Sequence, residues 1–182
     1  MHRHHRHLAD MLVEDHNHIL EALDLIPVYL DKLSKGELEP RHVERLIEFL
    51  SHFADRCHHG KEEDILFPLM ERRGAGFWEG PLGVMTCEHG MGRYLLRNAR
   101  NSVRRYASGD GEALRALRHY LEGYRRLLTQ HIDKENNILF PMARQLVREG
   151  EGLEEAHRAE EEMDHESYLR ELEELKRLAG WG

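Results

Sequence analysis

Cysteine, aromatic residues and long apolar runs are all scarce in this 182-residue chain. Two cysteines, Cys57 and Cys87, cannot build the disulfide framework on which small secreted domains depend. Aromatic residues make up only 7%, which favours helices over sheets. No apolar run approaches the roughly 18 residues of a transmembrane helix, and the short stretch 8–13, interrupted by Asp10, is no signal-peptide core. We therefore expect a cytoplasmic protein that does not bind membranes.

The charge balance also excludes one class of partner. With 34 acidic and 26 basic residues the formal net charge is −8, which argues against nucleic-acid binding. Apolar residues at 40% and charged residues at 33% are typical of a globular protein with one sizeable core. The anomaly is histidine, with 15 residues. Several of them lie in residues 1–7, MHRHHRH, which we expect to be a disordered His/Arg-rich arm.

One motif occurs twice in the chain, at an offset of 73 residues. Residues 58–70 read HHGKEEDILFPLM and residues 131–143 read HIDKENNILFPMA. Both contain His-x-x-Lys-Glu-x-x-Ile-Leu-Phe-Pro. The same offset relates His16 to His89, and each of these follows an acidic residue. The chain therefore consists of two copies of one unit, each with a lone histidine followed by a His-x-x-x-Glu motif.

Apolar residues recur at three- and four-residue spacing over four long segments, about 8–33, 40–74, 82–107 and 112–148. Short breaks separate them, and no strand pattern appears. This organisation predicts an all-α protein in which residues 8–148 form an up-down-up-down antiparallel four-helix bundle. Pro68 and Pro141 interrupt the second and fourth helices at matched positions. Residues 153–179 carry a thin apolar stripe, which predicts a C-terminal helical extension packed on the bundle or forming a homodimer contact.

Residues four apart on a helix face the same direction, so each His-x-x-x-Glu motif presents two ligands to one side. A single pair of this kind is often a surface ion pair, but two copies at one offset argue against that interpretation. Mixed imidazole and carboxylate donors suit iron or manganese, with zinc a substitute, and the number of donors fits two metal ions. The predicted metal ligands are His16, His58, Glu62, His89, His131 and Glu135.

The repeat also decides between neighbouring candidates. His59 and Glu63 have the same spacing, but their counterparts are Ile132 and Asn136, so this pair fails in the second copy. His18 lies about 200° around the helix from His16 and cannot share its direction. The remaining histidines are interpreted as surface residues or as a layer outside the ligands: His18, His52, His59, His119, His157 and His165.

Five other residues lie close to the predicted ligands in the sequence. Tyr120 and Tyr124 precede His131 on its own face, where they either orient the imidazoles or serve as core aromatics. Lys61 and Lys134 are paired by the repeat and are expected to reach the surface. Cys57 is expected to be a buried structural residue rather than a ligand.

The ordered set of these motifs over residues 8–148 resembles the hemerythrin-like HHE cation-binding domains, and the C-terminal extension resembles a bacterial and archaeal type within them. The resemblance implies a four-helix bundle around a non-haem di-iron centre with an oxo or hydroxo bridge, in which the six predicted residues are ligands and the two glutamates bridge. Arg93 stands where oxygen-carrying hemerythrins have a second histidine on the third helix. The sequence thus resembles a four-histidine variant, in which Arg93 is a candidate for attracting an anionic ligand.

Three functions follow from this interpretation. The first is a di-iron protein, not an enzyme, that binds or senses oxygen, nitric oxide or iron. The alternative is a di-iron oxidoreductase that acts on peroxide or nitric oxide. A structural zinc protein is a third candidate, but six ligands are too many for one closed, four-coordinate site. The expected partner is a diatomic molecule or peroxide.

Overall fold

The computed structural model describes residues 6–181, and every regular element in that range is helical. The expectation of an all-helical protein without strands is confirmed over this part of the chain. None of its helices combines the length and the apolar character that crossing a bilayer requires. Residues 1–5 of the predicted disordered arm lie outside the described residues.

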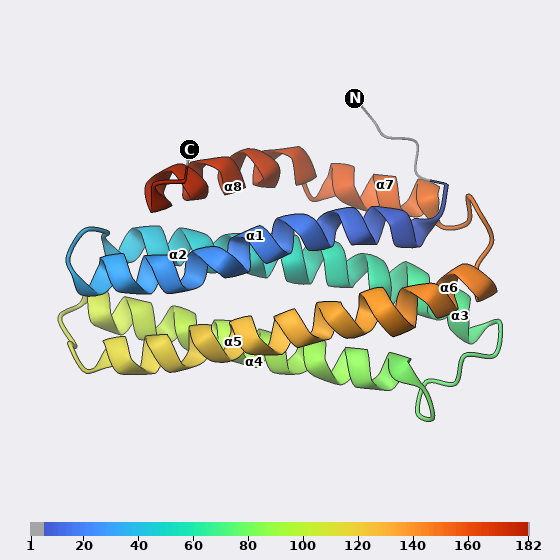
Figure 1. Cartoon of the computed structure of the whole chain (residues 1–182), viewed down its shortest axis with the longest axis horizontal. Coiled ribbons are helices and arrows are strands. Elements are labelled where there is room, and N and C mark those ends of the chain that lie inside the picture. The colour runs from blue at the N-terminus through green and yellow to red at the C-terminus, as the bar shows by residue number, and fades with distance from the viewer. Residues whose placement is uncertain (1–5, 182) are drawn as a thin grey trace.

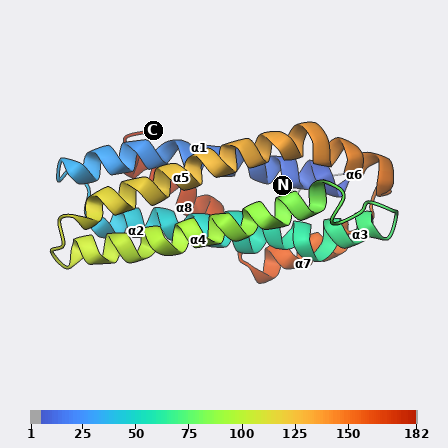
Figure 2. The same cartoon turned by 90° about the horizontal axis from the view of Figure 1, so that it is seen from below.

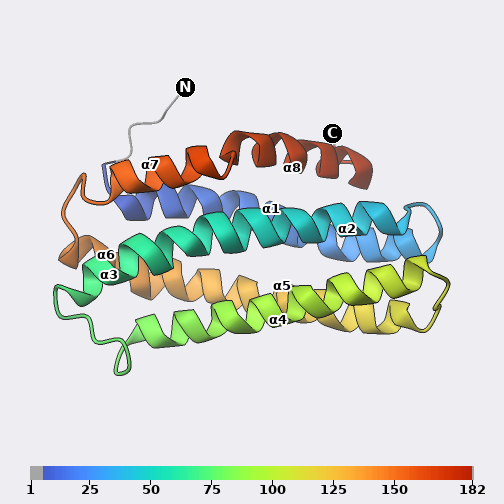
Figure 3. The same ribbon diagram turned by 180° about the vertical axis from the view of Figure 1, so that it is seen from behind.

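Four helical rods run along the long axis of the molecule, and successive rods point in opposite directions (Figure 1, and Figure 3 from behind). The first rod is α1 (Leu8–Ser34) and the third is α4 (Pro81–Ala107). The second consists of α2 (Pro40–Phe49), η1 (Leu50–His59), η2 (Glu62–Leu66) and α3 (Phe67–Glu71). The fourth consists of α5 (Ala113–Lys134), η3 (Glu135–Leu139) and α6 (Phe140–Leu146). Figure 2 shows α4 beside α5 over most of their length. This arrangement is compatible with the expected four-helix bundle.

The second and fourth rods widen locally into π-helix at matched positions, in η2 and η3. The N–H of Phe67 donates to the carbonyl of Glu62, five residues back, and the twin pair Phe140 and Glu135 makes the same bond. The next residue in each copy is proline, which has no N–H to continue the α-helical pattern. The repeated prolines therefore mark a widened turn in both copies of the motif.

The C-terminal residues form α7 (Leu153–Glu162) and α8 (His165–Ala179), which run along the outside of the bundle, where α8 packs on α1 and on the second rod (Figure 1). The chain enters α7 through Gly152 at φ 77°, where a Cβ would stand 2.9 Å from a methyl group of Ile65. The Tyr29 hydroxyl on α1 donates to the carbonyl of Leu175 at 2.8 Å. Leu172 and Leu175 are buried against the bundle, so this chain itself covers the apolar stripe. A homodimer through the extension stays a prediction.

Arg6 and His7, the last two residues of the predicted arm, contact the folded part of the chain. His7 is buried and caps α1, because its side chain accepts a hydrogen bond from the N–H of Ala9 at 3.0 Å. Its other ring nitrogen lies 3.1 Å from the carbonyl oxygen of Val147. The carbonyl of Arg6 accepts a hydrogen bond from Gly150. These contacts join the start of α1 to the segment that precedes the extension.

The core consists of two apolar clusters with a polar layer between them. The large cluster includes Ile19 on α1 and Leu96 on α4, whereas the small cluster includes Leu12 and Met85 of the same helices. The second and fourth rods likewise contribute to both clusters. The polar layer contains the buried histidines and acids of the two motifs. The fold thus holds these side chains away from water in the middle of the bundle.

Truncating the contact between α8 and the bundle tests how much the extension stabilises the fold. We expect Leu175→Ala to lower the free energy of unfolding by about 2–5 kcal/mol, because Leu175 is fully buried. Exposed Glu173→Ala, on the same helix, should change it by less than about 0.5 kcal/mol. Urea unfolding measures both. Equal, small effects would show that α8 does not stabilise the bundle.

Candidate metal centre

Six buried side chains meet in the polar layer, and they come from all four rods. Each is at most 1% exposed. They are His16 on α1, His58 on η1, Glu62 on η2, His89 on α4, His131 on α5 and Glu135 on η3. The structure therefore brings together all six residues that the repeat singled out.

Four of the six form a first set around His16. Its Nε2 lies 3.0 Å from Nε2 of His58 and 3.0 Å from Oε2 of Glu135. Nε2 of His58 lies 3.6 Å from Oε1 of Glu62. The ligand atoms of these four residues are all within 4.8 Å of one another. This set offers two imidazoles and two carboxylates to one point.

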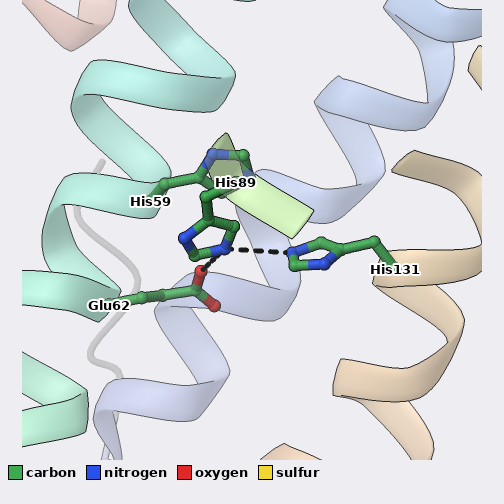
Figure 4. Close-up of side chains that lie close together, drawn as sticks. All are labelled: His59, Glu62, His89 and His131. Carbon is green, nitrogen blue, oxygen red and sulfur yellow. Dashed lines mark hydrogen bonds and ion pairs between the residues drawn. The ribbon is translucent and has the colours of Figure 1, made fainter. Parts of the chain in front are cut away.

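The second set is centred on His89, as Figure 4 shows. Nε2 of His89 lies 3.1 Å from Nε2 of His131 and 3.3 Å from Oε2 of Glu62. Nε2 of His131 lies 3.0 Å from Oε1 of Glu135. Glu62 and Glu135 therefore each place one oxygen toward each set. The two sets therefore form two neighbouring positions for a metal ion, and both carboxylates contribute to each position.

The spacing of the donor atoms suits a pair of metal ions, and several of the donor oxygens have no hydrogen-bond partner. Two nitrogens bound to one ion at about 2.1 Å and at a right angle lie about 3.0 Å apart, close to the observed separations. Both oxygens of Glu62 and Oε1 of Glu135 are buried and make no hydrogen bond, although imidazole nitrogens lie nearby. Buried carboxylate oxygens without partners are costly. The residues fit a two-metal group.

The pKa values point to the same need for positive charge. Burial lowers the pKa of His89, but the carboxylates of Glu62 and Glu63 outweigh burial and raise it to about 9. Burial raises the pKa of Glu135, but contacts with His131 and His16 outweigh burial and hold it well below its usual range. These shifts favour protons on the imidazoles of His89, His16 and His131 when no metal is bound. Metal binding must displace them, so metal affinity should fall as the pH falls.

An outer layer orients the imidazoles, and it obeys the same repeat. Nδ1 of His58 donates to Asp15 at 3.1 Å, and Nδ1 of His131 donates to Glu88 at 2.9 Å. Asp15 and Glu88 are the acids that precede the lone histidines in the two copies. An acceptor at Nδ1 keeps the proton there and turns the lone pair of Nε2 toward the centre.

The lone histidines are held in the same way. Nδ1 of His16 lies 2.8 Å from Oδ1 of Asn136, and Nδ1 of His89 lies 2.6 Å from Oε1 of Glu63. Asn136 and Glu63 are counterparts in the repeat. All four imidazoles therefore direct Nε2 to the centre and Nδ1 to an outer oxygen.

Comparison with known proteins agrees with this geometry. A model of the family described as hemerythrin HHE cation binding domain matches residues 7–143. The chain belongs to this family.

Curated relatives of this hemerythrin-like chain include the iron-sulfur cluster repair protein YtfE of Escherichia coli O81 (strain ED1a). It is 33% identical over 128 residues, which cover 69% of this chain and 56% of the relative. The protein of the same description from Escherichia fergusonii is 32% identical over the same shares. The chain thus spans about half the length of the curated relatives it matches. No solved structure matches it.

Lys61 corrects one expectation about this hemerythrin-like domain, because it is buried rather than at the surface. Its Nζ lies 2.7 Å from Asp15 and 2.5 Å from Glu160 of α7. The extension covers this side of the second rod, and Glu160 shares the lysine with the acid that orients His58. Lys134, the twin, is half-exposed as expected and donates to Glu88. Cys57 is buried, as expected, and forms no disulfide.

The two tyrosines that precede His131 and the candidate anion-binding residue, Arg93, lie in different places. Tyr124 is buried and its hydroxyl makes no hydrogen bond. Tyr120 is not at the centre, since its ring neighbours are Tyr94 and His119. Arg93 donates to Asp55 at 2.7 Å and to Glu63 at 2.8 Å. Two carboxylates thus neutralise Arg93, which does not support its predicted role in attracting an anion.

His59 lies closer to the centre than its lack of a counterpart in the repeat indicates. It is 2% exposed and joins Glu62, His89 and His131 in one possible metal-binding group. It lies in η1, where the wider π-helical turn lets adjacent residues face closer directions than in an α-helix. The offset of 73 gives no signal for it, because its counterpart is Ile132.

Removing one histidine from the centre should release metal, whereas removing a nearby histidine outside it should not. We expect His89→Ala to lose metal and His18→Ala to retain it. The His18 ring lies edge-on to Phe53 and belongs to neither set. The metal content per chain, measured after purification with iron, distinguishes the two variants. Equal loss in both variants would contradict the assignment.

Asp15 should stabilise the metal-free fold only while it is ionised. Burial raises its pKa, but Lys61 and His58 outweigh burial and hold the pKa below the ordinary value of 3.8. The stabilisation is therefore present above about pH 4 and lost as the pH falls. We expect Asp15→Asn to cost about 3 kcal/mol at pH 7 and clearly less at pH 3.

A matched control for this substitution is Asp10→Asn on the same helix. Asp10 pairs with Arg144 in a more exposed setting, and such pairs contribute about 0–1 kcal/mol. Urea unfolding in the presence of a chelator measures both variants at both pH values. A loss for Asp15→Asn that does not depend on pH would contradict the ionic account.

Proposed function

We propose that this chain binds two non-haem iron ions and presents them to a small molecule such as nitric oxide, oxygen or peroxide. The observation that carries the proposal is the contact of Glu62 and of Glu135 with imidazoles of both donor sets, with three carboxylate oxygens left without hydrogen bonds. In this proposal the rods are the up-down-up-down bundle of hemerythrins. Zinc or manganese could replace iron, because the same donors accept them.

The chain's residues have defined tasks in this function. His16 and His58 would hold one metal ion and His89 and His131 the other, and the two glutamates would offer an oxygen to each. Iron, when bound, supplies coordination positions and oxidation states that a small ligand can use. The outer acids keep each imidazole in the tautomer that binds metal.

The burial of the donor residues limits the size of a ligand that can reach the metal ions. The donor residues are at most 1% exposed. The ring of Phe140 stacks on His16 at 5.2 Å, and Phe67 lies 6.1 Å from His89 in a nearly parallel orientation. A diatomic molecule or peroxide can pass such packing through small side-chain motions, whereas a bulky substrate cannot. This favours a small ligand over a large organic one.

A second candidate is iron-sulfur cluster repair, which the printed name of the curated relatives favours. Repair needs iron that can be bound and released. Four neutral imidazoles and two carboxylates hold iron without thiolates, so the pH and the iron's oxidation state can shift its affinity. The test is to incubate the loaded chain with a cluster enzyme damaged by nitric oxide. Restored cluster absorbance with the native chain, but not with Glu62→Ala, would support repair.

Iron stoichiometry tests the two-iron proposal. Titration with Fe(II) without air should saturate at two ions per chain, and Glu62→Ala should hold less because it removes a carboxylate from both positions. Asp64→Ala is the control, since Asp64 is exposed and two residues away. Saturation at one ion, or equal binding by both variants, would overturn the proposal.

Addition of nitric oxide to the reduced, loaded chain separates binding from turnover. We expect a new visible band that saturates at a fixed ratio of nitric oxide to protein, with no further consumption. Continued consumption of nitric oxide or peroxide that disappears in Glu135→Ala would instead favour the oxidoreductase.

A further inference from the structure

His59 is a buried histidine without a role in the six-residue set. It is 2% exposed, and its Nε2 is buried without a hydrogen-bond partner. A buried imidazole nitrogen left unpaired costs free energy unless another group uses its lone pair. The question is therefore what Nε2 of His59 binds.

The other ring nitrogen settles which tautomer His59 adopts. Nδ1 of His59 lies 3.3 Å from Oδ1 of Asp55, one helical turn earlier, and the same oxygen accepts a hydrogen bond from Nε of Arg93 at 2.7 Å. An ionised carboxylate can only accept, so Nδ1 carries the proton. Nε2 then has a free lone pair. The four imidazoles of the centre are held by outer oxygens in the same way.

The position of His59 directs it to one side of the centre. Its ring stacks on His89 at 3.8 Å with an interplanar angle of 13°, and it stands edge-on to His131 at 5.5 Å (Figure 4). A ring nitrogen of His59 lies within 4.8 Å of the ligand atoms of Glu62, His89 and His131. The set around His16 and His58 does not include it.

The repeat makes the contrast sharper. The counterpart of His59 is Ile132, which is buried in the large apolar cluster and offers no donor. Both halves have two central imidazoles with an outer oxygen at each Nδ1, although the neutral Asn136 in one half replaces the acidic Glu63 of the other. His59 is thus the one donor that one half of the centre has and the other half lacks, among the residues that the structure describes.

We propose that His59 is an additional imidazole ligand of the metal position held by His89 and His131, which makes the two positions unequal. This inference rests on the proposed two-iron function. The position at His89 would then have three imidazoles, and the position at His16 would have two.

Mössbauer spectroscopy of the full chain loaded with ⁵⁷Fe tests this without measuring activity. The wild-type protein should show two quadrupole doublets of equal area. In His59→Ile, which copies the residue in the other half, one doublet should move toward the other while the second stays unchanged. Ile132→Leu, a conservative change at the matched position, should keep both doublets. Two wild-type irons with a single doublet, or unchanged doublets in His59→Ile, would overturn the inference.

A metal-release measurement adds a second readout. In a chelator competition, one of the two irons should leave His59→Ile at least about tenfold more readily than it leaves the wild type. If His59→Ile folds poorly, His59→Gly with added imidazole replaces it, and imidazole should restore the wild-type spectrum. Failure of imidazole to do so, with two irons bound, would count against a ligand role. Wild-type protein that never holds two irons would refute the proposed function itself.

Discussion

Two glutamates are buried among four imidazoles between two apolar clusters, and the rest of the structure accommodates this arrangement. An ionised carboxylate removed from water costs several kcal/mol unless positive charge or hydrogen bonds replace the lost hydration. Here three of the four carboxylate oxygens lack hydrogen bonds. Burial lowers the pKa of His89, but the carboxylates of Glu62 and Glu63 outweigh burial and raise it, which favours a proton on His89 when no metal is bound. The helices therefore bring together donor groups whose negative charge is balanced only when cations or protons bind to them.

The twofold sequence repeat relates the outer residues around the centre as well as the six central ones. Each imidazole that points to the centre has an outer acceptor, and the acceptors themselves are related by the repeat. The symmetry ends at the surface of the second rod. There α7 supplies Glu160 to Lys61, whereas Lys134 in the other half stays half-exposed. The extension thus contacts the residues that orient His58 but not those that orient His131, and this adds to the asymmetry that His59 introduces.

The sequence was sufficient to predict the helices and the convergence of the six central residues, because both follow from periodic spacing and an exact offset. It was not sufficient for His59 and Lys61. The offset of 73 residues identifies only residues that have a counterpart of the same type in the other copy, and the counterpart of His59 is Ile132. The directions of side chains around the helix were predicted for α-helical turns, whereas η1 is a π-helix. Lys61 would be exposed on an isolated bundle, and only the tertiary position of α7 buries it. Asp15, Glu88, Glu63 and Asn136 lay within reach of the same offset argument, because each has a twin beside a predicted ligand.

The central claim is that two metal ions lie side by side between the shared glutamates. A crystal structure of the iron-loaded chain, with anomalous diffraction collected on both sides of the iron absorption edge, tests it most directly. The account predicts two iron peaks, one at His16 and His58 and the other at His89 and His131, with Glu62 and Glu135 touching both. A single peak, or iron bound elsewhere while these side chains keep their mutual contacts, would contradict it.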